Sequence, residues 1–156
     1  MKSTGKIIEE NAGWAAFVIG VVLACFISPE KYHYSALING FPAIGLGVFG
    51  FMLTFIAIIL QSSNKTIDYM KSQEPLFRCF INYNKRVVYV SAILTLYTYL
   101  ISSFCIPDDC VGLTIGGITI QRIIKIAAIS LFWGFFLKLC VDMFFFIKSF
   151  YILLRK

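Results

Sequence analysis

The sequence has few charged side chains and a single histidine. Charged residues make up 14% of its 156 positions, which is about half the share of a soluble domain. A soluble protein of this composition would expose large apolar patches, and such patches aggregate. The shortage of charge therefore argues against a soluble domain and favours an integral membrane protein. Because His33 is the only histidine, we do not expect a metal centre. We expect no other cofactor either.

The residue patterns of the common enzymes are also missing. The sequence contains no Gly-rich phosphate loop, no serine or cysteine nucleophile with a histidine partner, and no carboxylate cluster with ligand spacing. Asp108 and Asp109 form an acidic pair, but beside Pro107 they are better explained as an outer turn. We therefore expect that the protein is not an enzyme.

Long apolar stretches are what the sequence has in abundance. Hydrophobic residues make up 59% of the chain and gather in four stretches. A helix needs about 20 apolar residues to cross the hydrocarbon core. The last three stretches reach that length, and the first reaches it only if residues 11–13 are counted. The sequence predicts an all-α membrane protein, a single domain with four transmembrane helices at about residues 12–28, 41–62, 86–105 and 121–150.

Basic residues are distributed unevenly between the segments that would face the two sides of the membrane. Ten lie near the termini or in and beside the link at residues 63–85, against three in or beside the loops at 29–40 and 106–120. Cytoplasmic segments carry an excess of lysine and arginine, so both termini and the link are predicted to be cytoplasmic. The basic residues are spread over three segments without a DNA-reading motif, so no direct nucleic-acid binding is expected.

Lys138 and Asp142 are the most costly residues inside the predicted spans. They are four residues apart and therefore share one face of a helix. An ionised side chain at membrane depth is unfavourable unless it is paired or wetted. The spacing predicts an intramembrane ion pair. A water-lined site for ion or proton movement and a contact between subunits are the alternatives.

Small residues recur at helical spacing in the first two predicted helices. Small residues at this spacing let two helix backbones approach closely, either within one chain or between copies. We expect a homo-oligomer, with the first helix as its seam. The residues predicted to pack in the oligomer are Ala12, Ala16, Gly20, Ala24, Gly45, Gly47 and Gly50.

The stretch "LTIGGITI" at residues 113–120 contains the most strongly marked turn of the chain. Two adjacent glycines can take the positive φ angles of a two-residue hairpin turn, with apolar residues and threonines mirrored around them. We expect a short extracytoplasmic β-hairpin, and a plain connector is the alternative. Two strands alone are marginal in water, so the hairpin needs support from a Cys105–Cys110 disulfide, the loop at 29–40 or a neighbouring copy. The predicted hairpin residues are Leu113, Ile115, Gly116, Gly117 and Ile118.

The link at residues 63–85 is the longest polar stretch of the chain. Its second half, "EPLFRCFINYNKR", either lies in the membrane interface or forms the cytoplasmic start of the third helix. The link is the expected docking surface for a cytoplasmic protein partner. The predicted docking residues are Lys65, Lys71, Arg78, Lys85 and Arg86.

The hydrophobic spans carry a resemblance to a known kind of protein. They read "ENAGWAAFVIGVVLACF", "FPAIGLGVFGFMLTFIAIIL", "VVYVSAILTLYTYLISSF" and "IIKIAAISLFWGFFLKLCVDMFFFI", and they cover about half of the chain. A short, basic chain of four such spans resembles the small membrane subunits of bacterial anti-phage systems, of the Kiwa type. The resemblance implies an inner-membrane oligomer that senses infection and recruits a cytoplasmic, DNA-binding partner. It carries over no functional residue, because the spans are not motifs.

Three classes of function are compatible with the sequence. The first is a sensor or scaffold of the bacterial inner membrane that oligomerises in the lipid bilayer and docks a cytoplasmic protein. The second is a small oligomeric ion channel or transporter that uses Lys138 and Asp142. The third, an intramembrane enzyme, has the least support. We expect the first.

Overall fold

The computed structural model describes residues 4–26, 34–62, 65–103, 114–115 and 118–154. Within these residues the chain forms five helices and two short strands. Their order is α1 (Thr4–Phe26), α2 (Tyr34–Gln61), α3 (Lys65–Ser72), α4 (Glu74–Ser103), β1 (Thr114–Ile115), β2 (Ile118–Thr119) and α5 (Ile120–Leu154).

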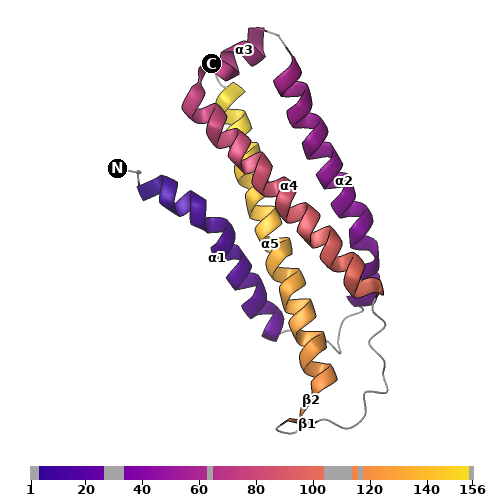
Figure 1. Ribbon diagram of the computed structural model, residues 1–156. Helices are drawn as coiled ribbons and strands as arrows, with labels where there is room; N and C mark the ends of the chain where they lie inside the picture. The colour runs from indigo at the N-terminus through magenta and orange to yellow at the C-terminus, as the bar shows by residue number, and fades with distance from the viewer. Residues whose placement is uncertain (1–3, 27–33, 63–64, 104–113, 116–117, 155–156) are drawn as a thin grey trace.

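The four long helices run alternately in opposite directions (Figure 1). The short helix α3 and the end of α5 lie at one end of the bundle, α1 starts part of the way along the same half, and β1 and β2 lie at the other end. We call the first of these the α3 end. Helices α4 and α5 form the centre, with α2 packed on α4 and α1 packed on α5.

Three of the helices are long and apolar enough to cross a membrane. The candidate spans are Ala36–Gln61 in α2, Glu74–Ser103 in α4 and Ile123–Leu154 in α5. Helix α1 contributes a shorter apolar segment, Asn11–Phe26. The chain is therefore a helical membrane protein.

The helices extend beyond the bounds that hydropathy predicts. Helix α1 begins at Thr4 rather than near residue 12, and α2 begins at Tyr34, inside the loop predicted at residues 29–40. Pro42 consequently lies inside α2 and not in its first turn. Polar residues such as lysine and glutamate propagate a helix well, and membrane helices tolerate an internal proline. The loss of hydropathy thus marks a change of surroundings and not the end of a helix.

The predicted link is mostly helical as well. Residues 65–72 form α3, and the second half of the link is the start of α4, which was one of the two alternatives. Pro75 lies at the second residue of α4, where its missing N–H costs no helical hydrogen bond. Ser72 ends α3 with a hydroxyl that donates to the carbonyl of Tyr69 at 2.7 Å.

The two strands pair antiparallel before α5 begins. Thr114 pairs with Thr119 and Ile115 pairs with Ile118, and α5 follows directly. The two central glycines and Leu113 of the predicted hairpin lie outside the described residues, and so do both cysteines of the predicted disulfide. The turn and the disulfide therefore stay predictions.

Stacked aromatic rings fill the core near the α3 end. Phe80 of α4 stacks on Phe146 of α5, with ring centroids 5.0 Å apart, and Phe55 of α2 meets Phe146 edge to face at 5.7 Å. Aromatic pairs in these geometries add stabilisation beyond their buried area. The cluster fixes α2, α4 and α5 against one another at the end of the bundle that carries the basic residues.

Candidate functional site

Helices α1 and α5 approach each other closely along a seam. A Cβ atom added at Gly20 would lie 2.7 Å from the backbone carbonyl oxygen of Trp133. A Cβ atom added at Gly134 would lie 2.8 Å from a methyl carbon of Val21. Glycine is therefore required at Gly20, because a backbone neighbour cannot move aside as a flexible side chain can, whereas Gly134 faces the side chains of Val21 and Phe17.

The predicted ion pair lies at this seam. The Nζ atom of Lys138 is 2.9 Å from Oδ2 of Asp142, one helical turn further along α5. Only 8% of the lysine side chain and 1% of the aspartate side chain are exposed. The spacing of four residues thus brings the two charges together, as the sequence predicts, and the pair is buried.

Helix α1 covers the pair. A Cβ atom at Gly13 would lie 2.7 Å from Oδ1 of Asp142 and 3.1 Å from Nζ of Lys138. The neighbouring Trp14 presents its indole ring 4.8 Å from the same Nζ atom, within the range of a cation–π interaction. The cation is therefore held between a carboxylate and an indole. Neither Gly13 nor Trp14 was predicted from the sequence, in which the small residues beside Gly13 were the only signal for this contact.

The predicted oligomer seam on the first helix is wrong. Gly20 and Ala24 are buried against α5 of the same chain, and Ala12 and Ala16 are half-buried. Close packing within one chain uses this face, which was the alternative interpretation of the small residues. Gly20 and Ala24 are thus not open to a second copy.

The glycines of α2 divide between two faces. Gly45 is buried, and a Cβ atom there would collide with the hydroxyl of Thr95 on α4. Gly47 and Gly50 are exposed, with no atom within 4 Å of an added Cβ. Of the seven residues predicted to pack in an oligomer, these two remain exposed on the outside of the bundle.

The basic residues predicted to dock a partner have different roles. The ammonium group of Lys71 donates to the carbonyl oxygens of Leu60 at 3.4 Å and Ser62 at 3.2 Å. These carbonyls end α2, where a cation is favourable. Lys71 therefore stabilises the end of α2, whereas the side chains of Lys65 and Lys85 are exposed.

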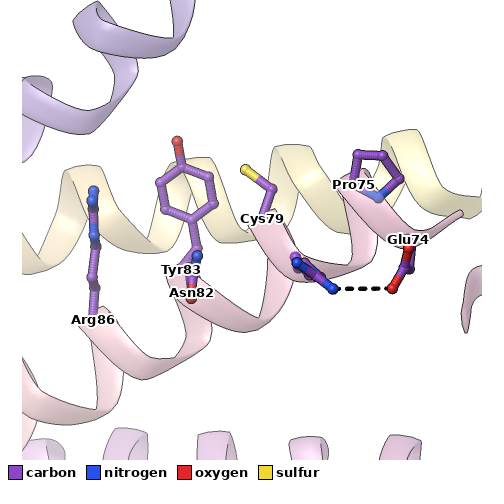
Figure 2. A pocket seen from close by; sticks show the side chains of 7 residues that line it. Glu74, Pro75, Cys79, Asn82, Tyr83 and Arg86 are labelled. Atoms are coloured by element: carbon purple, nitrogen blue, oxygen red, sulfur yellow. Dashed lines mark hydrogen bonds and ion pairs between the residues drawn. The ribbon is translucent and has the colours of Figure 1, made fainter. Parts of the chain in front are cut away.

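The remaining two arginines line a cavity at the α3 end. The cavity has a volume of about 380 Å³ and follows one face of the opening turns of α4 (Figure 2). Arg78 donates to Oε1 of Glu74 at 3.1 Å, and the guanidinium of Arg86 lies 5.6 Å from the ring centre of Tyr83. Sequence reasoning found the arginines but missed the rest of the lining, which repeats at a spacing of three to four residues. The lining comprises Glu74, Pro75, Arg78, Cys79, Asn82, Tyr83 and Arg86.

Two cysteines within the long helices, Cys25 and Cys140, are exposed. The side chain of Cys140 is exposed, because it points away from the seam that Lys138 and Asp142 face. Cys25 is also exposed, although its Sγ atom lies 3.4 Å from the hydroxyl oxygen of Ser130 on α5. Both side chains therefore lie on the outer surface of the bundle.

The described residues contain no group of three histidine, cysteine, aspartate or glutamate side chains that could hold a metal ion.

The fold and the α1–α5 seam define a helical membrane protein with a buried internal ion pair. Comparisons with protein-family models, with curated proteins and with solved structures find no match for this chain.

Proposed function

We propose that the protein is a scaffold or sensor subunit of the bacterial inner membrane that docks a cytoplasmic protein at the α3 end. The observation that carries this proposal is the set of exposed basic side chains at that end. Lys65 is the first residue of α3, Lys85 precedes the apolar run of α4 that begins at Val87, and both side chains are exposed. A positive surface of this kind suits a partner with an acidic surface, because complementary charge steers and orients association.

The orientation follows from charge and from the direction of the helices. Helix α5 ends at the α3 end and α1 starts in the half of the bundle nearer to it (Figure 1), and this is the end richest in lysine and arginine. Excess basic charge favours the cytoplasmic side. We propose that α1 is the fourth membrane-spanning helix, so that both termini are cytoplasmic.

A channel or transporter that uses the ion pair has less support. Asp142 is 1% exposed, and α1 of the same chain closes the pair on its open side. An ion path needs a carboxylate that water or an ion can reach. The pair is better explained as the means by which α5 holds α1.

The role in anti-phage defence is proposed from the resemblance in size and span pattern. It is tested by infection. Cells that carry this chain and its partner should survive a phage that kills cells lacking either one. Equal killing of all three strains across a broad phage panel would remove the defence role and leave the scaffold proposal standing.

Docking is tested by charge reversal at exposed positions. The variant Lys65→Glu/Lys85→Glu should lose a cytoplasmic protein that co-purifies with the native chain from its own membranes. Lys125→Glu is the matched control, because Lys125 is exposed near the opposite end of α5. Lys71 is left intact since its reversal would disturb the end of α2. Equal recovery of the partner with both variants, or no partner at all, would contradict the proposal.

A further inference from the structure

We propose that an apolar groove between α2 and α5 binds one acyl chain of a membrane phospholipid. The inference goes beyond the proposed function, because it needs no protein partner and involves none of the basic residues at the α3 end. The groove is lined by side chains from residues 36–44 of α2 and 132–136 of α5. Its volume of about 430 Å³ lies within the range of small-molecule sites, about 300–1,000 Å³.

The groove exists because α2 carries small residues where α5 carries aromatic rings. A Cβ atom added at Gly40 would meet nothing within 4 Å, so among the described residues no other side chain fills the space beside this glycine. Leu37 and Ile44 border the same space and are exposed. Because its walls are exposed, an occupant can enter the groove from outside the bundle.

Aromatic rings form a preformed floor. Phe41 meets Phe132 edge to face, with ring centroids 5.4 Å apart, and Phe132 stacks on Phe136 at 6.0 Å. Phe41 and Phe132 belong to the buried core that joins α2, α4 and α5. The floor is therefore fixed before anything binds, which lowers the ordering cost of binding.

The lining presents carbon to its occupant. Nε1 of Trp133 is the single polar side-chain atom among the lining residues, and it is itself buried. A ligand with polar groups would give up its hydrogen bonds on entering and find no side-chain partner in the groove. An acyl chain has no polar group to satisfy, so the lining matches hydrocarbon.

The groove lies at the depth of the hydrocarbon core. Both of its walls fall inside the candidate spans Ala36–Gln61 and Ile123–Leu154. Helix α4 is also free of charge at this level, since Gly45, which follows the last groove residue of α2, packs against Thr95. Thr95 lies in the middle of the uncharged run at residues 87–103. The neighbouring helices thus agree that this end of the groove is deep in the membrane.

The other end of the groove lies near the membrane surface. Ser102, one residue before α4 ends, donates to Oδ1 of Asn39 at 2.7 Å, so residues 36–39 of α2 are level with the last turn of α4. The groove therefore runs from the end of α4 to the level of its middle, on the side of the bundle that carries β1 and β2.

The length of the groove matches one leaflet of the bilayer. It follows α2 from Ala36 to Ile44, which is about 12 Å at 1.5 Å per residue, and half of the hydrocarbon core is about 15 Å thick. An acyl chain of one leaflet covers this depth. A membrane-spanning helix of a partner or a second copy would run along the whole thickness, so the short groove favours the chain.

The test is quenching of Trp133 fluorescence by brominated lipid in purified full-length protein in a neutral detergent. The chain has two tryptophans, so Trp14→Phe leaves Trp133 as the sole indole and keeps an aromatic ring beside Lys138. Phosphatidylcholine with brominated acyl chains should quench Trp133 in a saturable way, because a bound chain lies against the indole. Quenching that rises only in proportion to the lipid fraction would overturn the proposal, since it would report ordinary contact with surrounding lipid.

A second lipid separates the chain from its headgroup. Phosphatidylglycerol with the same brominated chains should saturate within about twofold of the phosphatidylcholine concentration, because no charged residue lines the groove. A preference of about tenfold or more for either lipid would show that the headgroup carries the recognition, and the acyl-chain assignment would then be wrong.

The variants locate the effect in the groove, each in the Trp14→Phe background. Gly40→Phe fills the groove from α2 and should weaken the saturable quenching at least about fivefold. Gly47→Phe is the matched control, because this exposed glycine lies two turns further along the same face and outside the lining. The control should leave quenching within about twofold.

If Gly40→Phe does not fold, Ala36→Phe takes its place from the preceding turn, with the same expected loss. Unchanged quenching in the groove variant would overturn the proposal. An equal loss in Gly47→Phe would overturn it too, because it would mean that a second copy covers this face of α2. None of these results bears on partner docking, since no partner is present.

Discussion

Lys138 determines what its neighbours on two helices can be. Its ammonium group needs an anion, which Asp142 supplies 2.9 Å away. The carboxylate in turn leaves no room for a side chain at Gly13, and Trp14 places its ring 4.8 Å from the cation. The pair itself was predictable from its spacing of four residues. Its cover was not, because periodicity within one helix does not reveal which other helix packs on it.

Charge removal at the pair tests its coupling. Asp142→Ala alone should lower the free energy of unfolding by about 3–5 kcal/mol, because it strands a buried cation. Lys138→Met/Asp142→Leu should recover most of this loss, since apolar residues of similar volume can replace a buried pair. Reversible unfolding in sodium dodecyl sulfate measures both values. A double variant that loses as much as Asp142→Ala and Lys138→Met, each measured alone, lose together would show that the side chains act separately.

Gly13 should tolerate no methyl group. An added Cβ atom would lie 2.7 Å from Asp142 Oδ1, so Gly13→Ala should destabilise the protein by about 1–3 kcal/mol through overpacking. Gly40→Ala is the matched control, because nothing lies within 4 Å of its added Cβ. That control should be neutral or stabilising by up to about 1 kcal/mol. The same unfolding assay measures both variants, and equal effects at the two glycines would show that Gly13 does not lie close to Asp142.

At the scale of elements, the helices continue where the hydropathy falls. Helix α4 begins at Glu74, although its apolar run begins at Val87. Pro75 gives a local signal for this start, since proline suits a first helical turn. No comparable signal precedes Tyr34, where α2 begins. Membrane spans were therefore predictable from composition, whereas helix ends in polar sequence were predictable only where a proline marked them.

The α1–α5 seam can be trapped by a disulfide. Ser130→Cys would bring a second thiol beside Cys25, whose Sγ atom lies 3.4 Å from the hydroxyl that is replaced. Oxidation should then join α1 to α5 within one chain, detected as a cross-linked peptide by mass spectrometry.

Gly20→Leu provides the counterpart, because its side chain would meet the backbone of Trp133 and separate the helices. Adding this change to Ser130→Cys should reduce the cross-link several-fold. Gly50→Leu, at an exposed position on α2, should leave it unchanged. Equal cross-linking in all three proteins would mean that α1 does not pack on α5 through Gly20.

At the scale of the whole molecule, the two ends of the bundle differ in charge. The strong excess of basic residues near the termini and the link was readable from the sequence, and it predicts the cytoplasmic side. What the sequence could not separate was the use of each charge. Lys71 holds the end of α2, Arg78 and Arg86 line a cavity, and Lys65 and Lys85 are exposed. These roles depend on contacts between elements that are distant in the chain.

The expected homo-oligomer must use a surface other than the α1–α5 seam. Gly47 and Gly50 are exposed on α2, and small residues there permit close approach of another helix. Gly47→Leu/Gly50→Leu should convert the native oligomer to monomers in mild detergent, as measured by native mass spectrometry. A native chain that is already monomeric would contradict the expectation.

The central claim is that the α3 end faces the cytoplasm and contacts a protein there. A photo-crosslinking amino acid placed at position 65, 85 or 125 and activated in living cells tests orientation and docking together. The account predicts adducts with the same cytoplasmic protein from positions 65 and 85, and none with it from position 125. Adducts from position 65 or 85 with extracytoplasmic proteins, or a cytoplasmic adduct from position 125 alone, would contradict it.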